Sequence, residues 1–359
     1  MNYNTSKHNN FQYIDKIFRK KSNEVDRVKY FRFDRNERIA PFPNKFLNKL
    51  KKNLKSEHLT SYPNFKTLYN LISKDLKLNK NNLLLTAGSD IAIKKCFELL
   101  IKKNDHIITI YPTYGMVDVY AKIFRANQKK IYYKEQLNLD ISKILKNINR
   151  KTKLIILANP NSPTGTIIEQ KNLLNIIKKA SSMNAFVLID ECYYGFYKET
   201  FAKKIHKFKN LIISRSLSKA YGLAGCRIGY LISNKNLIKR FIKLKPMHEI
   251  SYFSAYTAES FFKNRKVVND YIFEVKNGLI YFKNFLNKHQ LYYFNTYANF
   301  ILVDFKNQKI FKKMLKEAKK MKILIHGEPN LPGCRNFIKF TLGPINYMKI
   351  IEKLILKCI

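Results

Sequence analysis

The sequence of 359 residues has no tryptophan and few cysteines, and it lacks any long apolar run. Its five cysteines stand far apart, form no C-x-x-C pair and are odd in number, so they indicate neither a disulfide framework nor a zinc site. No apolar run reaches the length of a membrane span, and the N-terminus lacks the apolar core of a signal peptide. We therefore predict a cytoplasmic protein with no metal site and no contact with a membrane.

Acidic residues are also scarce, since 25 Asp and Glu face 68 Lys and Arg and leave a formal net charge of +43. Such an excess can mark proteins that bind nucleic acids or anionic membranes. The lysines, however, are scattered along the whole chain, and no RRM, KH, zinc-finger or helix-turn-helix pattern accompanies them. Lys, Asn, Ile, Tyr and Phe are all abundant, which is typical of an AT-rich genome. We therefore predict small-molecule partners and no nucleic acid.

What the chain does contain is a series of short apolar runs, each followed by a polar turn. These predicted strands lie at residues 83–86, 106–110, 154–158, 186–190 and 211–213. Strands and helices alternate from residue 83 to residue 232, which predicts an α/β fold with a largely parallel sheet between helices. Open sheets of this kind bind ligands just beyond the carboxyl ends of their strands.

The length of the chain favours two domains. A long helical pattern at residues 267–287 precedes predicted strands at 300–304, 323–325 and 337–341 and a last helix from Ile345. We therefore predict an N-terminal arm (1–40), a large domain (41–287) and a smaller C-terminal α/β domain (288–359).

The segment after the strand at 211–213 carries the clearest chemistry. It contains Ser216, Ser218, Lys219 and Arg227. Hydroxyl groups and an arginine can cradle a phosphate dianion, and a lysine amine can form a Schiff base with a cofactor aldehyde. The alternative is a polar turn between two strands.

A second candidate for phosphate binding follows the strand at 83–86. Gly88, Ser89 and Asp90 indicate a turn with Ser and Asp at the cap position of a helix. Free backbone amides at a helix start can hold a phosphate, and the alternative is a plain helix cap.

The pattern Ser-x-Ser-Lys followed by Gly-Leu-Ala-Gly-x-Arg-x-Gly-Tyr at residues 216–230 resembles the pyridoxal 5′-phosphate (PLP) lysine motif of class I/II aminotransferases. The likeness is greatest to the histidinol-phosphate aminotransferases and extends from about residue 33 to the C-terminus. It implies a fold type I PLP-dependent transferase, with a large domain that holds the mostly parallel sheet and a smaller C-terminal α/β domain. It also implies a homodimer with PLP as its cofactor.

The resemblance assigns roles to several residues. Lys219 would carry PLP, and Gly88–Asp90, Ser216, Ser218 and Arg227 would bind its phosphate. A carboxylate that ends an apolar strand needs a partner, and Asp190 would find it in the protonated pyridine nitrogen. Three tyrosines have roles: Tyr114 would stack on the pyridine ring, Tyr193 would donate to the phenolic oxygen, and Tyr62 would reach the phosphate of a partner subunit.

The loop Asn159-Pro160-Asn161-Ser162-Pro163-Thr164-Gly165 resembles the family's Asn-Pro-x-x-Pro-Thr-Gly loop. The family usually has Asn before the second proline, where it donates to the phenolic oxygen. Ser162 occupies that position here, and its hydroxyl is shorter. Asn161 or a water molecule are the alternatives for this contact.

The substrate-binding positions depart further from the family. Asn36 lies in a segment that resembles the family's Asn-Glu segment over the substrate. Lys339 and His326 stand where the family has arginines for the α-carboxylate and the phosphate, and Arg335 is a nearby substitute. Because lysine cannot reproduce the fork of arginine, histidinol phosphate is a poor guess for the substrate.

The sequence thus predicts a PLP-dependent aminotransferase that moves an amino group from an amino-acid donor, such as glutamate, to a small keto or phosphorylated keto acceptor. Lys219 would act as general base and acid. The first alternative is a PLP-dependent decarboxylase of a phosphorylated amino acid, resembling threonine-phosphate decarboxylase. The second is a non-catalytic protein that binds PLP or nucleic acid.

Overall fold

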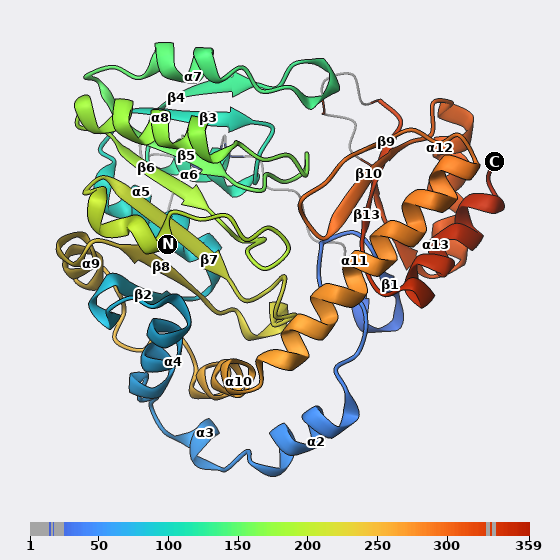
Figure 1. Cartoon of the computed structure of the whole chain (residues 1–359), viewed down its shortest axis with the longest axis horizontal. Coiled ribbons are helices and arrows are strands. Elements are labelled where there is room, and N and C mark those ends of the chain that lie inside the picture. Colours follow the sequence, from blue (N-terminus) through green and yellow to red (C-terminus); the bar gives the residue numbers. More distant parts are fainter. Residues whose placement is uncertain (1–13, 16, 18–24, 328–330, 332–334) are drawn as a thin grey trace, which may run out of the picture.

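The computed structural model describes residues 14–15, 17, 25–327, 331 and 335–359. A sheet of seven strands forms the centre of the larger part of the molecule (Figure 1). Its order is β2 (Leu83–Thr86), β8 (Gly229–Ser233), β7 (Leu211–Ser216), β6 (Phe186–Asp190), β5 (Thr152–Ala158), β3 (His106–Tyr111) and β4 (Asn127–Tyr132). The pairs from β7 to β4 are parallel, and β8 runs antiparallel to both of its neighbours. The predicted, mostly parallel sheet is confirmed.

Helices cover both faces of this sheet because its strands are apolar on both sides. Leu84 points to one face, where α5 (Gly88–Leu100), α6 (Met116–Ile123) and α9 (Lys235–Ile242) pack. Leu83 and Leu85 point to the other face, which is covered by α4 (Lys66–Leu76), α7 (Ile141–Asn147), α8 (Gln170–Ser182) and α10 (Tyr252–Lys263). The sheet is therefore fixed from both sides, and its strand ends are held in place.

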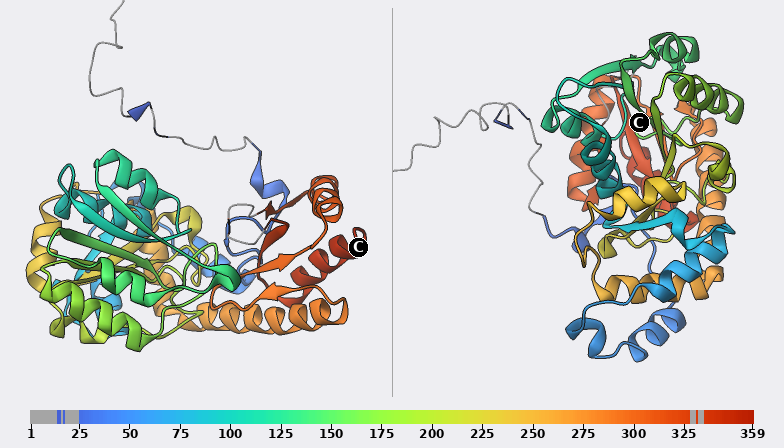
Figure 2. Two further views of the ribbon diagram at one scale, coloured as in Figure 1. Left: turned by 90° about the horizontal axis from the view of Figure 1, so that it is seen from above. Right: turned by 90° about the vertical axis from the view of Figure 1, so that its left-hand side faces the viewer.

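A smaller antiparallel sheet forms the second part of the molecule. Its order is β12 (His326–Gly327), β13 (Phe337–Thr341), β10 (Phe300–Asp304) and β9 (Tyr293–Phe294). It packs with α12 (Gln308–Lys320), α13 (Ile345–Leu356) and the second half of α11 (Arg265–Lys288) around a separate apolar core. The long helix α11 runs from one part to the other (Figures 1 and 2).

Residues 31–42, here called the strap, follow the N-terminal region and lie beside the smaller sheet. Strand β1 (Phe31–Arg32) pairs in parallel with β11 (Ile323–Leu324), and Phe33 is fully buried in the smaller core. The domain boundaries at residues 40 and 287 stay predictions. The strap lies mostly within the predicted arm of residues 1–40, and it packs with the small domain.

The remaining helices are short. Helices α2 (Asn44–Lys52) and α3 (Glu57–Thr60) lead from the strap to the large domain, and 3-10 helices lie at Arg27–Lys29, Lys80–Asn82, Glu135–Leu137, Ala202–Lys207 and Ala224–Cys226. In the part of the chain that the structure describes, no helix has the length and apolar character needed to cross a membrane.

Candidate active site

A cavity of about 550 Å³ lies at the carboxyl ends of the central parallel strands, between the strap and β13. Most of the side chains predicted from the sequence line it. These are Asn36, Ser89, Asp90, Tyr114, Ser162, Asp190, Tyr193, Ser216, Ser218, Lys219, Arg227 and Lys339.

Lys219 follows β7 by three residues and reaches the centre of this cavity. Its Nζ donates a hydrogen bond to the backbone oxygen of Arg35 in the strap, at 2.9 Å. Burial lowers the pKa of Lys219, and the positive charges of Lys339 and Arg227 lower it further. A lower pKa leaves more of the amine neutral near pH 7, and the neutral amine is the form that attacks an aldehyde.

The start of α5 and Arg227 together form a cradle for an anion. Gly88 begins the helix with a φ of +84°, and a Cβ added there would lie 3.1 Å from Nη2 of Arg227. The helix cap is Ala87, which has no capping side chain. The prediction that Ser89 and Asp90 cap this helix is therefore wrong: the turn at Gly88 places both in the first helical turn, whose amides have no helical acceptor.

Two serine hydroxyls complete this cradle from the end of β7. Ser216 Oγ accepts from the backbone amide of Ser218 at 3.1 Å. Ser218 Oγ is buried, and it has no hydrogen-bond partner among the described residues. A buried hydroxyl without a partner is costly, and a phosphate oxygen would satisfy it. This orphaned hydroxyl, the helix start and Arg227 fit the phosphate group of PLP.

Asp190 and Glu191 are adjacent buried carboxylates in different environments. Arg215 neutralises Glu191, with Nη2 2.8 Å from Oε2. Asp190 receives a hydrogen bond from Ser214 Oγ at 2.6 Å, and burial still raises its pKa to about 6. Because Asp190 lies in the cavity wall without an arginine or lysine in its hydrogen bonds, a protonated pyridine nitrogen fits the position beside it.

Tyr193 is buried and holds its hydroxyl at the cavity. The amide Nδ2 of Asn36 donates to this hydroxyl at 2.8 Å. Burial raises the pKa of Tyr193, whereas hydrogen bonds from Ser162 and Asn36 act in the opposite direction. Ser162 therefore lies at the cavity beside Tyr193.

Asn161 does not lie where it could donate to the phenolic oxygen of a cofactor in the cavity. Its side chain is fully buried and is bonded to Thr113 Oγ1, to the backbone oxygen of Pro112 and to Thr164 Oγ1, at 2.7, 2.9 and 2.9 Å. It does not line the cavity. Its amide holds the loop in shape, so of the two protein alternatives for the phenolic contact only Ser162 faces the site.

Lys339 is the small domain's contribution to the cavity wall. It lies buried on β13, with its Nζ 5.7 Å from the ring centre of Phe300. His326 pairs with Lys339 in the register of β12 and β13, but it is exposed and outside the cavity wall. Arg335 is also exposed and outside the wall. Only Lys339 of these three substrate-binding candidates therefore faces the cavity.

Two tyrosines differ in their exposure. Tyr114 lines the cavity, and burial and the charge of Asp90 raise its pKa. Tyr62 is 81% exposed, lies outside the cavity wall and stacks on His248 at a centroid distance of 4.3 Å. Stacking of Tyr114 on a cofactor ring and a role for Tyr62 in a second subunit stay predictions.

The strap supplies two more site residues from the predicted Asn-Glu segment, where the sequence assigned a role only to Asn36. Asp34 and Glu37 line the cavity and share Arg27, whose Nη1 and Nη2 lie 2.8 and 2.7 Å from their carboxylate oxygens. Arg32 also pairs with Glu37, at 3.2 Å. The alternation of charges over residues 32–37 was the available signal for such a network.

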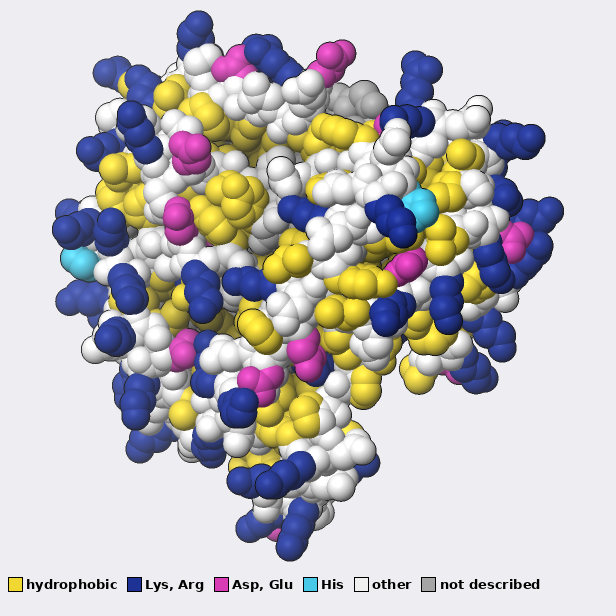
Figure 3. Space-filling model, turned by 45° about the vertical axis from the view of Figure 1, so that its right-hand side comes forward, with side chains coloured by type: hydrophobic (Ala, Val, Ile, Leu, Met, Phe, Trp, Pro, Cys, Tyr) yellow, Lys and Arg dark blue, Asp and Glu magenta, His cyan; other side chains and the backbone are white. Residues whose placement is uncertain are grey.

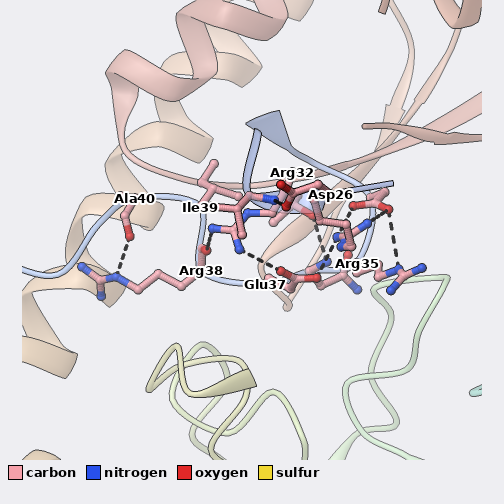
Figure 4. Close-up of polar contacts among 12 residues, drawn as sticks. Asp26, Arg32, Arg35, Glu37, Arg38, Ile39 and Ala40 are labelled. Atoms are coloured by element: carbon pink, nitrogen blue, oxygen red, sulfur yellow. Dashed lines mark hydrogen bonds and ion pairs between the residues drawn. The ribbon is translucent and has the colours of Figure 1, made fainter. Parts of the chain in front are cut away.

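Arg38 joins the strap to the lysine-bearing loop. Its guanidinium lies 4.4 Å from the ring centre of Phe42 and 3.8 Å from that of Tyr271. Its Nε donates to the backbone oxygen of Ala40 at 2.9 Å (Figure 4). A Cβ on Gly222, which has a φ of +73°, would lie 2.5 Å from Arg38 Cδ. The strap therefore packs directly against the loop that carries Lys219.

Many charged side chains lie outside the cavity, on the face shown in Figure 3 and elsewhere among the described residues. Lysines and arginines are spread over the face of the molecule seen in Figure 3 instead of forming one patch. Within the described residues, no group of three or more His, Cys, Asp and Glu side chains is placed to hold a metal ion. Cys334 lies outside the described residues, and the other four cysteines are free thiols.

Comparisons with known proteins agree with this geometry. The sequence model of the family "Aminotransferase class I and II" matches residues 34–350. The histidinol-phosphate aminotransferase of Caldanaerobacter subterraneus subsp. tengcongensis is 30% identical over 330 residues, which cover 90% of this chain and 92% of that protein.

Solved structures share the fold at low identity. The histidinol-phosphate aminotransferase of Sinorhizobium meliloti in complex with pyridoxal-5'-phosphate superposes with a TM-score of 0.83 at 17% identity, covering 96% of this chain and 97% of that one. The L-threonine-O-3-phosphate decarboxylase of Porphyromonas gingivalis gives a TM-score of 0.76 at 18% identity, covering 91% and 98%. The predicted fold is therefore confirmed.

Proposed function

Because the chain belongs to the class I and II aminotransferase family and is a PLP-dependent aminotransferase, we propose that it transfers an amino group from an amino-acid donor, such as glutamate, to a small keto or phosphorylated keto acceptor. The observation that carries this proposal is one cavity that brings together Lys219, Asp190 and the unpartnered hydroxyl of Ser218. These groups match the aldehyde, the ring nitrogen and the phosphate of PLP.

PLP supplies an electron sink for the bond that breaks at the Cα of the bound substrate. The residues of this chain do the rest. Lys219 would hold the cofactor through its Nζ, and the same amine is placed to act as general base and acid for the Cα proton of the substrate. Asp190 keeps the ring nitrogen protonated, and Tyr193 donates to the phenolic oxygen. Ser218, Arg227 and the start of α5 hold the phosphate.

We assign the donor's α-carboxylate to Lys339. Its amine is buried in the cavity wall, on the side that β13 contributes. A lysine binds a carboxylate as a point charge, so its grip is weaker and less directional than that of an arginine fork. The relatives are named for histidinol phosphate. The position expected to bind the substrate phosphate is His326 in this chain, and His326 lies outside the cavity wall. This supports an acceptor other than the keto counterpart of histidinol phosphate.

The test is a screen of donors and acceptors on the holoenzyme. Glutamate and other amino acids are added one at a time while the yellow absorbance of the bound cofactor is followed. Loss of that absorbance, and its return with a keto acceptor, is expected; histidinol phosphate and its keto counterpart belong in the panel. Borohydride reduction and peptide mapping should place the cofactor on Lys219. A cofactor adduct on another lysine, or no response to any donor, would contradict the proposal.

A decarboxylase is the second candidate. The observation that favours it is that Lys339 and His326 stand where arginines were expected for the substrate of an aminotransferase. A phosphorylated amino acid would need other contacts than those arginines provide. The structural likeness to L-threonine-O-3-phosphate decarboxylase, at 18% identity, concerns the fold alone. Release of carbon dioxide from a phosphorylated amino acid, without formation of a keto acid, would establish this activity instead.

We further propose a homodimer that acts in the cytoplasm. Tyr62 supports the dimer, because a highly exposed tyrosine outside the cavity wall is free to meet a second subunit. The four free cysteines support a reducing compartment. A stable, fully active monomer in sedimentation experiments would contradict the dimer, and export of the protein would contradict the location.

A further inference from the structure

We propose that Asn36 is a positioning residue that holds the Tyr193 hydroxyl with its proton directed at the phenolic oxygen of PLP. This inference rests on the proposed function. It concerns the contact to the phenolic oxygen, for which position 162 offers only the short hydroxyl of Ser162.

Asn36 is fixed from three directions. Its backbone amide donates to Thr341 Oγ1 at 2.9 Å, and its backbone oxygen accepts from Asn299 Nδ2 at 3.1 Å. It is buried and has a φ of +56°, which asparagine tolerates better than most residues. The small domain therefore determines where its side chain lies, and that side chain reaches Tyr193 in the large domain at 2.8 Å.

The direction of this hydrogen bond decides what Tyr193 can do. Asn36 Nδ2 is the donor, so it occupies a lone pair of the Tyr193 oxygen and leaves the phenolic O–H to donate elsewhere. Ser162 acts on the same oxygen in the same sense. With one lone pair occupied by the Asn36 amide, Tyr193 has its proton available for an acceptor in the cavity, and the phenolic oxygen of PLP is such an acceptor.

Among the described residues that line the cavity, no side-chain amide besides Asn36 is present to replace the missing asparagine. Asn161 is next in sequence, but its side chain already bonds to Thr113, Pro112 and Thr164. The contact to the phenolic oxygen thus rests on Tyr193, with the short hydroxyl of Ser162 beside it. A residue that sets the direction of the Tyr193 proton therefore also sets the charge on the cofactor's phenolic oxygen.

The readout is the pH titration of the visible absorbance of the bound cofactor. A hydrogen bond from Tyr193 stabilises the negative charge of the phenolic oxygen. When this bond is weaker, the phenolic oxygen attracts the proton on the Lys219 Schiff base more strongly. The apparent pKa of the Schiff base then rises. The charged and titratable groups facing Lys219 and Tyr193 are Asp190, Cys192, Arg227, Glu37 and Lys339. All of them stay unchanged in the variants below, but Asn36→Asp adds a carboxylate whose charge also raises this pKa, so Asn36→Ala is the variant free of added charge.

Two substitutions of Asn36 test whether this residue sets the direction of the Tyr193 hydroxyl. Asn36→Asp keeps the shape but offers an acceptor, which draws the Tyr193 proton away from the cofactor. Asn36→Ala removes the donor and leaves the hydroxyl free to rotate. We expect the apparent pKa to rise in both, by roughly 1 in Asn36→Asp and by less in Asn36→Ala. Unchanged titrations in both variants would overturn the inference.

The same change in a Tyr193→Phe background tests whether Asn36 acts through Tyr193. There, Asn36→Ala should cause no further rise, because the group that it positions is absent. An equal rise in both backgrounds would show that Asn36 acts on the cofactor directly and would overturn the positioning role. Asn210→Ala is the matched control: Asn210 is buried and bonded to backbone oxygens of Ile177 and Ala185, so its loss should lower stability without moving the titration.

The experiments distinguish a failure of the role of Asn36 from a failure of the proposed function. If the unmodified protein binds PLP and titrates but exchanges no amino group, the proposed function fails while the Asn36 test remains readable. If amino transfer occurs and the Asn36 variants titrate like the unmodified protein, the inference alone fails.

Discussion

The two walls of the cavity are built in different ways. The cofactor-facing wall (Ser89, Asp90, Asp190, Tyr193, Ser216, Ser218, Lys219 and Arg227) comes from positions within a few residues of strand ends in one sheet. The substrate-facing wall (Asn36, Glu37 and Lys339) comes from the strap and β13, which are far apart in the sequence. The first wall is fixed by a sheet that is packed on both faces, whereas the second depends on how two segments meet. We therefore expect changes in the first wall to affect chemistry and changes in the second to affect the choice of substrate.

The largest effect is expected in the cofactor-facing wall. Asp190→Asn should keep PLP bound but lower the rate of amino transfer by about 10²- to 10³-fold, because a neutral partner no longer holds the ring nitrogen protonated. Single-turnover rates with a donor, measured together with cofactor content, test this. Near-normal turnover would remove the electron-sink role from Asp190.

The same variant should gain stability when the cofactor is absent. Burial raises the pKa of Asp190 to about 6, whereas the unfolded carboxyl has its ordinary value of 3.8. As the pH rises between these values, the unfolded chain ionises first and the folded state loses stability. Cofactor-free Asp190→Asn avoids this loss and should be more stable above pH 6, by up to about 3 kcal/mol.

Chemical unfolding of both cofactor-free proteins over a range of pH checks this expectation. The difference should shrink as the pH falls below about 6, where the wild-type carboxyl regains its proton. A difference that does not depend on pH would show that Asp190 is not the group responsible.

The contact between the strap and the Lys219 loop, next to the two walls, can be disturbed at Gly222. Gly222→Ala places a Cβ against Arg38 at a φ of +73°, so we expect a loss of about 2 kcal/mol in the free energy of unfolding. Denaturant unfolding measures it. Adding Arg38→Ala should recover part of this loss, because the two changes share one contact. Simple additivity would argue against the contact.

In the substrate-facing wall, Lys339→Arg should restore a bidentate contact to the donor's carboxylate. The expected gain is about 1–3 kcal/mol in donor binding, seen as a lower KM in the donor half-reaction. A loss confined to acceptor turnover would instead assign Lys339 to an acceptor without a carboxylate. No change in either half-reaction would show that Lys339 does not contact substrate.

The smallest effect is expected at Tyr62, which lies outside both walls. Tyr62→Phe removes one hydroxyl and should weaken PLP binding by about 1 kcal/mol, the usual worth of one hydrogen bond. Equilibrium binding of PLP to the dimer measures it. Equal affinity in the variant would remove Tyr62 from the cofactor site.

Sequence patterns predicted those parts of the fold that are buried on both faces. The strands at 83–86 and 186–190 match β2 and β6, because a short, fully apolar run bounded by polar turns is typical of a strand that is covered on both sides. Strand β4 (Asn127–Tyr132) was not predicted. It is an edge strand with exposed polar positions at Asn127 and Lys129, so it lacks the apolar signal.

The same limit applies to the site. Lys219 and Asp190 were predicted because local motifs place them at strand ends, and the structure brings both to one cavity. The bonds from Lys219 to the Arg35 oxygen and from Asn36 to Tyr193 were not predicted. They join segments more than a hundred residues apart, and they depend on packing that no local pattern contains.

The pairing of β1 with β11 fixes an order of events during synthesis of the chain. Phe31 and Arg32 leave the ribosome long before their partners Ile323 and Leu324, which lie far downstream in the sequence. Domains fold as units while synthesis proceeds, so the sheet that positions Lys219 and Asp190 can form long before the strap has a place to dock. The strand ends that carry Lys219 and Asp190 can therefore be in place first, and the strap completes the cavity only after β11 has been made.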